Sequence, residues 1–173
     1  MEKRILIIPL IFFVTITNIC AQKSDEGSKY EYLFPKALPG WTATKIYYYE
    51  REDELFGDLT IRLTKTYRQN NDNTKITINI DTGEEMLRLV YLNYKLEKML
   101  KDPAKKEYDS IQYKSYQGFK VYDENKNLKE ILIGIAGGYI RLELNPAGNI
   151  NFLNDYLNSA DLEKIKTFIE DSY

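Results

Sequence analysis

Apolar and polar residues alternate along two neighbouring segments of the chain, which a polar turn at residues 70–73 separates. The apolar positions are Leu59, Ile61 and Leu63 in the first segment and Ile76, Ile78 and Ile80 in the second. Successive side chains of a strand point to opposite faces, so this period of two predicts a hairpin with one buried face. Residues 41–49 predict another strand beside this hairpin, with apolar residues on both of its faces.

A second block of strands is predicted after residue 110. Residues 111–121 alternate around a turn that is expected at Gly118. Residues 131–136 are apolar on both faces, which is typical of a central strand. The pair Gly137 and Gly138 then predicts a two-residue hairpin turn into a last strand.

Helical spacing indicates where the sheet is covered. Thr82 and Glu85 form a capping box, and apolar residues recur every three or four positions until Pro103 ends the run. Residues 152–157 and 162–169 predict two shorter helices near the end of the chain. The predicted fold class is therefore α+β, a mainly antiparallel sheet of about six or seven strands with a long central helix and C-terminal helices packed on it.

The first 21 residues resemble an export signal. Lys3 and Arg4 precede an apolar run over residues 5–16, and Ala21 offers a small residue for cleavage. The run is shorter than the roughly 20 residues that a membrane-spanning helix needs. We therefore expect a secreted or periplasmic protein without a transmembrane helix. The predicted organisation is a signal peptide over 1–21, a flexible leader over 22–32 and a single α+β domain over 33–173.

Cys20 and the net charge define the expected partners. Lipid modification of Cys20 would hold the domain on a membrane, but residues 17–19 lack the small residue expected beside a lipidated cysteine. Anchoring is therefore the less favoured interpretation.

Removal of residues 1–21 changes the formal net charge from −2 to −3, because Glu2, Lys3 and Arg4 are lost. Neither nucleic acid nor an anionic membrane is the expected partner of such a chain.

The absence of two residue types excludes the commonest catalytic chemistries. The chain has no histidine, and Cys20 is its only cysteine. Imidazole and thiolate are the usual groups for catalysis near neutral pH and for binding transition metals. A Ser-His-Asp triad, thiol catalysis, the usual zinc sites and a disulfide are therefore excluded after residue 21. We expect no enzyme, no cofactor and no metal.

Two groups of acidic residues are weak candidates for chemistry. Asp123, Asn125 and Asn127 have the spacing of a calcium loop, but Leu128 and Gly134 occupy the positions that need glycine and glutamate. A solvated turn is therefore the favoured interpretation. The second group is an acidic cluster that comprises Glu50, Glu52, Asp53 and Glu54. A pair of its carboxylates leaves open a hydrolase that acts on glycans.

Aromatic residues provide the candidate binding surface. The chain has 15 tyrosines, and Tyr47, Tyr48 and Tyr49 are consecutive, so their side chains project from both faces of the predicted strand. Tyrosine suits recognition because it combines a broad apolar ring with a hydroxyl group. We take Trp41, Tyr47 and Tyr49 as candidate binding residues. Sheet packing and translation from an AT-rich genome are the alternative explanation for so many tyrosines.

The run Leu38, Pro39, Gly40 and Trp41, which leads into strands after an export signal, resembles a group of small, uncharacterised secreted bacterial proteins. The arrangement of elements also resembles the PsbP/Mog1-type fold. This resemblance implies an accessory or binding protein and carries over no catalytic residue. The expected function is that of an exported non-catalytic binding protein, which contacts another envelope or extracellular protein. The alternatives are the glycan hydrolase and a carrier of a small apolar ligand.

Overall fold

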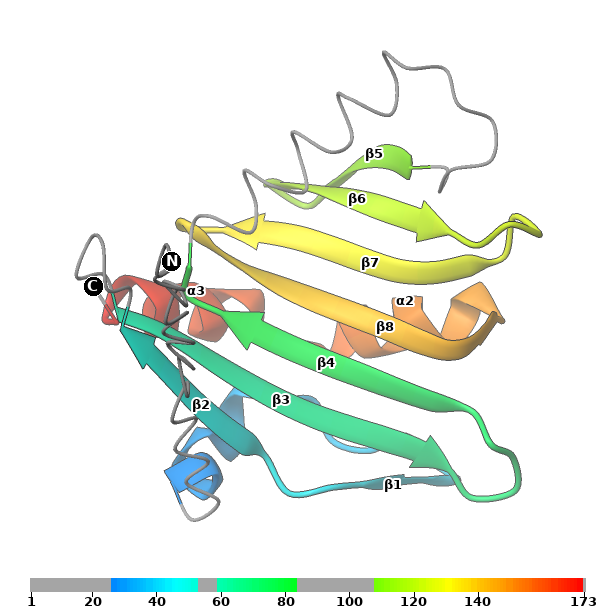
Figure 1. Cartoon of the computed structure of the whole chain (residues 1–173), viewed down its shortest axis with the longest axis horizontal. Helices are drawn as coiled ribbons and strands as arrows, with labels where there is room; N and C mark the ends of the chain where they lie inside the picture. The colour runs from blue at the N-terminus through cyan, green and yellow to red at the C-terminus, as the bar shows by residue number, and fades with distance from the viewer. Residues whose placement is uncertain (1–25, 53–58, 84–107, 173) are drawn as a thin grey trace, which may run out of the picture.

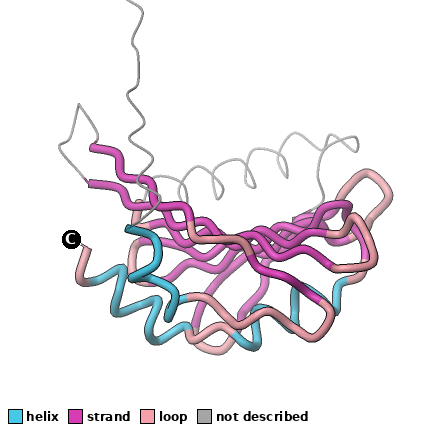
Figure 2. The backbone as a smooth tube through the Cα atoms, turned by 90° about the horizontal axis from the view of Figure 1, so that it is seen from below, coloured by secondary structure: helices cyan, strands magenta, loops and turns pink. Residues whose placement is uncertain are grey.

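The computed structural model describes residues 26–52, 59–83 and 108–172 (Figure 1). Within them, eight strands form one antiparallel sheet and three short helices lie along one of its faces (Figure 2). The strands are β1 (Trp41–Ala43), β2 (Tyr47–Glu52), β3 (Leu59–Gln69), β4 (Lys75–Asp81), β5 (Tyr108–Tyr113), β6 (Tyr116–Tyr122), β7 (Leu128–Ile135) and β8 (Gly138–Gly148). The helices are the 3₁₀ helix η1 (Glu26–Leu33) and the α-helices α2 (Ile150–Ser159) and α3 (Leu162–Glu170).

The strand order is β1-β3-β4-β8-β7-β6-β5, and β2 pairs with β3 at the same edge as β1. β1 and β2 pair with opposite ends of β3. The interruption between β1 and β2 falls where η1 packs closely against the chain. A Cβ added at Gly27 of η1 would lie only 2.3 Å from the carbonyl oxygen of Ile46. The single strand predicted over residues 41–49 is therefore divided in two. The predicted β3–β4 hairpin and the central position of β7 are confirmed.

The predicted fold class is wrong in its helical part and in its strand number. The sheet has eight strands, and the described residues contain three short helices and no long central one. The long helix expected after Thr82 falls at residues 84–107, outside the described residues, and Thr82 itself is not helical. Its hydroxyl accepts a hydrogen bond from the amide of Ile61 at 2.9 Å, and its own amide donates to the carbonyl of Ile61 at 3.0 Å. Thr82 thus extends the pairing of β3 and β4, and the predicted capping box with Glu85 lies partly outside the described residues.

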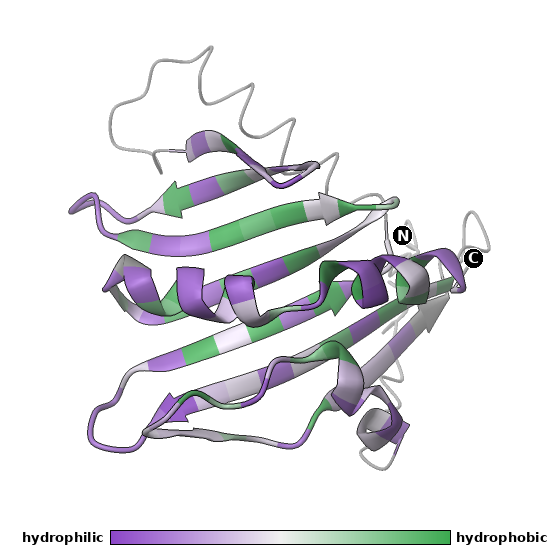
Figure 3. Ribbon diagram, turned by 180° about the vertical axis from the view of Figure 1, so that it is seen from behind, coloured by the Kyte–Doolittle hydropathy of each residue, from purple (hydrophilic) through white to green (hydrophobic). Residues whose placement is uncertain are grey.

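The core lies between the helices and one face of the sheet. Ile78 of β4 pairs with Leu142 of β8, which pairs with Ile131 of β7, and all three side chains are fully buried. The amphipathic helices α2 and α3 cover this row and contribute Leu153 and Ile165 to the same cluster. Figure 3 shows the resulting alternation of apolar and polar positions along the strands behind these helices. The two predicted C-terminal helices are therefore confirmed. Each buried aliphatic side chain contributes about 1.5–3 kcal/mol to the stability of the fold.

Two predicted glycine turns are wrong by a few residues. The β7–β8 turn is formed by Ala136 and Gly137, which have φ angles of 48° and 90°. Gly138 instead begins β8, where a Cβ would lie 2.3 Å from the backbone oxygen of Asp81. Similarly, Gly118 lies within β6, where a Cβ would lie 2.3 Å from the backbone oxygen of Leu132. These glycines are required by close backbone approach within the sheet and not by turns.

The segment predicted as a flexible leader is partly ordered. Glu26–Leu33 form η1, and Leu33 is buried in the main core, so a helix begins within the residues predicted as a leader. η1 is attached to the sheet by an ion pair between Glu31 and the amine of Lys65. Lys65 lies in β3 between the buried residues Leu63 and Tyr67 and is itself only 3% exposed. A buried ammonium needs a partner, and this requirement positions η1.

Replacement of Glu31 with alanine is expected to lower the free energy of unfolding by about 2 kcal/mol. Breaking a fully buried pair costs roughly 3–5 kcal/mol, but the Glu31 side chain is 63% exposed, so solvent screening reduces this effect. Urea unfolding measures the change. Adding Lys65→Met to Glu31→Ala is expected to recover most of the loss, because no charge is then left buried. The exposed Glu124→Ala serves as the control. Equal stability of Glu31→Ala and Glu124→Ala would contradict the role assigned to the pair.

Candidate functional site

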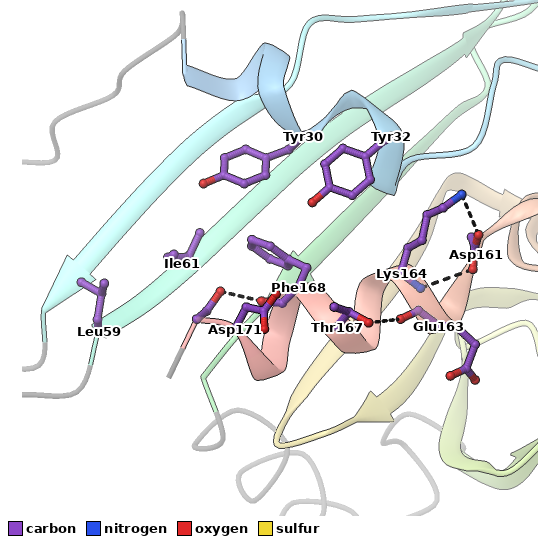
Figure 4. Close-up of a pocket in the computed structure, with 11 residues that line it drawn as sticks. Tyr30, Tyr32, Leu59, Ile61, Asp161, Glu163, Lys164, Thr167, Phe168 and Asp171 are labelled. Carbon is purple, nitrogen blue, oxygen red and sulfur yellow. Dashed lines mark hydrogen bonds and ion pairs between the residues drawn. The ribbon is translucent and has the colours of Figure 1, made fainter.

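A groove of about 690 Å³ lies between η1, the beginning of β3 and α3 (Figure 4). Its volume falls in the range of roughly 300–1,000 Å³ that is usual for binding sites. The lining residues are Tyr30, Tyr32, Leu59, Ile61, Asp161, Glu163, Lys164, Thr167, Phe168, Asp171 and Ser172. We call this feature the η1–α3 groove.

One wall of the η1–α3 groove is aromatic and aliphatic. The ring of Tyr30 stacks on that of Tyr48 with centroids 5.7 Å apart, and it meets the ring of Phe168 edge to face at 5.3 Å. These contacts fix η1 against both β2 and α3. Tyr32 and Leu59 are less enclosed, with 57% and 38% of their surfaces exposed. The groove therefore offers apolar surface to solvent on a support that is held by core residues.

The other wall is a single face of α3. Each of these residues has partners three or four positions away, which places them on one face of a helix: Lys164, Thr167, Phe168 and Asp171. Asp161 caps the start of α3 and accepts a hydrogen bond from the amide of Lys164 at 3.3 Å. The spacing of these polar residues was visible in the sequence, but η1, which forms the opposite wall, was not predicted.

Hydrogen bonds and ion pairs order the polar groups of this wall. The amine of Lys164 lies 2.8 Å from Oδ2 of Asp161. Hydrogen bonds from the Lys164 side chain and amide lower the pKa of Asp161 below its ordinary value. Tyr116 of β6 donates its hydroxyl to Oε1 of Glu163 at 2.9 Å. Burial, followed by this bond, raises the pKa of Tyr116. The wall thus stays negatively charged at neutral pH, because Lys164 neutralises only one of its carboxylates.

A second polar cluster lies on the sheet face opposite the helices. Asp81 is fully buried and accepts bonds at one oxygen from Nε of Arg62 at 2.6 Å and from the hydroxyl of Tyr139 at 3.1 Å. Its other oxygen accepts a bond from the amide of Gly83 at 2.9 Å. Burial alone would lower the pKa of Arg62, but the hydrogen bond and charge of Asp81 raise it overall. Both Asp81 oxygens are thus engaged, which suits a structural role.

The same face carries a second ion pair, between β8 and β7. A guanidinium nitrogen of Arg141 donates to Glu130 at 2.8 Å, and Nε lies 2.7 Å from the other carboxylate oxygen. Nε has no aligned hydrogen bond despite this distance, so the second contact is electrostatic. Arg141 also lies 3.5 Å from Glu143. Such paired charges hold neighbouring strands in register, and we treat both clusters as part of the fold.

The structure separates the three predicted binding residues. Trp41 is 7% exposed, and its ring packs edge to face against Phe152 at 5.2 Å and Tyr156 at 5.7 Å, so its role is in the core. Tyr47 is 46% exposed, and Tyr49 is partly buried. Both pair with β3 residues on the sheet face opposite the helices, away from the η1–α3 groove. A binding role for these two tyrosines stays a prediction.

The acidic candidates are distributed between described and undescribed residues. Glu50 accepts a hydrogen bond from the hydroxyl of Tyr48 at 3.0 Å, whereas Asp53 and Glu54 lie outside the described residues. The side chain of Glu52 also lies outside the described part of the chain. In the loop considered for calcium, Asp123 accepts bonds from the amides of Asn125 and Asn127, as in an Asx turn. No group of three or more acidic side chains converges as a metal site within the described part of the chain.

No protein-family model matches this chain, and no curated protein or solved structure matches it. The resemblance to the PsbP/Mog1-type fold therefore stays a prediction. None of the helices in the described ranges combines the length and the apolar character needed to cross a membrane.

The cap of α3 predicts a specific dependence of stability on pH. The pKa of Asp161 is lower in the folded chain than its ordinary value of 3.8. Its charge therefore contributes stability at neutral pH, and this contribution is lost as the pH falls from about 4 through the folded pKa. Asp161→Asn keeps a capping oxygen but carries no titrating charge. Urea unfolding at pH 6 is expected to show a less stable variant, and the difference should shrink steadily as the pH is lowered below about 4. A difference that stays constant over this range would contradict this account.

Proposed function

We propose that this is an exported, non-catalytic binding protein that holds a segment of another envelope or extracellular protein in the η1–α3 groove. One observation carries the proposal. Among the described residues, three large hydrophobic side chains are exposed, and two of them, Tyr32 and Leu59, line this groove. Exposed apolar groups beside hydrogen-bonding groups are typical of protein-binding surfaces.

The composition of the groove favours a protein segment over the two alternative ligands. A carrier of a small apolar molecule needs an enclosed apolar site, whereas this groove has an exposed aromatic wall and a charged wall. A glycan hydrolase needs a carboxylic acid whose pKa is raised so that it can donate a proton. The pKa of Asp161 in the groove is lowered. A partner protein can use both walls without any catalytic group.

Photo-crosslinking in the native envelope tests the proposal. A photoreactive phenylalanine analogue is placed at Tyr32 in one protein and at Tyr47 in another. Tyr47 is the matched control, because it is also an exposed tyrosine but lies on the opposite face. We expect a crosslinked partner from position 32 and none from position 47. Crosslinking from position 47 alone would move the binding surface to the other face and contradict the proposal.

Binding by the purified partner then provides the quantitative test. The double variant Tyr32→Ala/Leu59→Ser is expected to weaken affinity by about tenfold or more, because truncation of apolar side chains at the centre of an interface typically costs 1–2 kcal/mol or more. Tyr47→Ala should change affinity by less than about twofold. Isothermal titration calorimetry measures both, and melting curves verify that each variant is folded. Equal affinity of the double variant and the unmodified protein would contradict the groove as the binding site.

A further inference from the structure

We infer, building on the proposed function, that the η1–α3 groove selects an extended polypeptide segment in which lysine or arginine alternates with apolar residues. Three features support this inference: the charge of the α3 wall, the aromatic character of the η1 wall, and the length of the α3 wall. Each of them restricts a different property of the bound segment.

The α3 wall is complementary to positive charge. It presents the carboxylates of Asp161, Glu163 and Asp171 against one amine, that of Lys164. This amine is already paired with Asp161 at 2.8 Å. Glu163 and Asp171 therefore keep negative charge that no lysine or arginine of the groove lining neutralises. In Figure 4 the Glu163 carboxylate points away from Tyr30 and Tyr32, and it accepts the hydroxyl of Tyr116 of β6 at 2.9 Å, so the position that favours a cation is at the Asp171 end of the groove.

The end of α3 strengthens this preference. The carbonyl groups at the C-terminal end of a helix carry a partial negative charge, which normally favours basic residues there. α3 has no basic residue in its last turn and is capped by Asp171. The Asp171 carboxylate thus adds to the partial negative charge at the end of the helix. The resulting repulsion destabilises the protein when no ligand is bound. A cationic side chain of a bound segment would remove this repulsion.

The η1 wall suits apolar side chains and the stems of basic ones. Tyr30 and Tyr32 present aromatic surface from η1, and aromatic faces also attract cations. The chain itself provides an example, because the amine of Lys29 lies 4.9 Å from the centroid of the Tyr30 ring. A segment that lies between the walls therefore meets carboxylates on one side and rings on the other.

The dimensions of the groove define the length and pattern of the segment. Its α3 residues extend from Asp161 to Asp171, and ten helical steps correspond to about 15 Å. An extended chain covers this length with about four or five residues. Because successive side chains of an extended chain point in opposite directions, alternate residues face the acidic wall and the aromatic wall. The pattern that uses both walls is therefore basic and apolar in alternation.

Synthetic capped hexapeptides test this inference directly by fluorescence anisotropy. The first probe alternates arginine with leucine, the second has glutamate in place of arginine, and the third has the composition of the first with its arginines in one block. Spermidine serves as a small organic cation. We expect the alternating basic peptide to bind at least tenfold more tightly than the glutamate peptide and at least threefold more tightly than the block peptide. Its affinity should fall as salt is raised.

Matched variants locate the charge effect. Glu163→Gln/Asp171→Asn is expected to weaken binding of the alternating basic peptide at least fivefold. The control, Glu124→Gln/Asp155→Asn, removes the same net charge from exposed positions outside the groove and should change affinity less than twofold. The melting temperature of Asp171→Asn should be equal to or above that of the unmodified protein, so that lost binding cannot be attributed to unfolding.

Several results would overturn the inference. Equal binding of the glutamate peptide, equal binding of the block peptide, or equal losses in the two double variants would each contradict it. Displacement of the peptide by an equal concentration of spermidine would indicate a site for small organic cations. Absence of binding by every peptide would also overturn it. In all these cases crosslinking from Tyr32 decides separately whether the groove binds a partner protein.

Discussion

A positive charge inside the core determines how the beginning of the ordered chain is placed. Lys65 lies in the middle of β3 among residues that are fully buried, and its amine can remain charged there only beside a carboxylate. Glu31 provides that carboxylate, while the rings of Phe34 and Tyr67 lie 5.8 and 5.6 Å from the amine. This ion pair holds η1 on the sheet together with the buried side chain of Leu33 and the ring of Tyr30. The pairing of this one charge therefore contributes to the position of the aromatic wall of the groove.

The second wall has a different origin. α3 is amphipathic: Ile165 and Ile169 are fully buried in the core, whereas Lys164 and Asp171 lie on the side that borders the groove. Phe168 belongs to the core and also to the groove, because it is only 8% exposed and its ring contacts that of Tyr30. The groove is therefore a consequence of the core packing of α3 on one side and of the ion pair, ring contacts and buried Leu33 of η1 on the other. The residues that line the groove therefore lie on elements that already belong to the fold.

The parts of the fold that follow from local periodicity could be predicted, and those that depend on distant contacts could not. The alternation of Ile76, Ile78 and Ile80 was sufficient for the β3–β4 hairpin, because the pattern itself defines the buried face. The position of Gly138 was misjudged, since its requirement arises from the approach of β4, far away in sequence. Tyr30 lies in a polar segment without periodicity, so only the contacts of η1 reveal it as part of a site. The candidate site was missed for this reason.

The unequal attachment of the two walls has a consequence for the kinetics of recognition. The sheet and α3 form most of one continuous core, whereas η1 is a short 3₁₀ helix that contributes Leu33 to that core and is otherwise held by an ion pair and a few ring contacts. Segments of this kind detach at a lower free energy than the global unfolding of the domain. On the proposed function, a bound segment contacts η1 as well as α3, so the measured dissociation constant would equal the intrinsic one divided by the fraction of molecules with η1 docked. A bound segment would in turn protect the backbone amides of η1 from exchange with solvent.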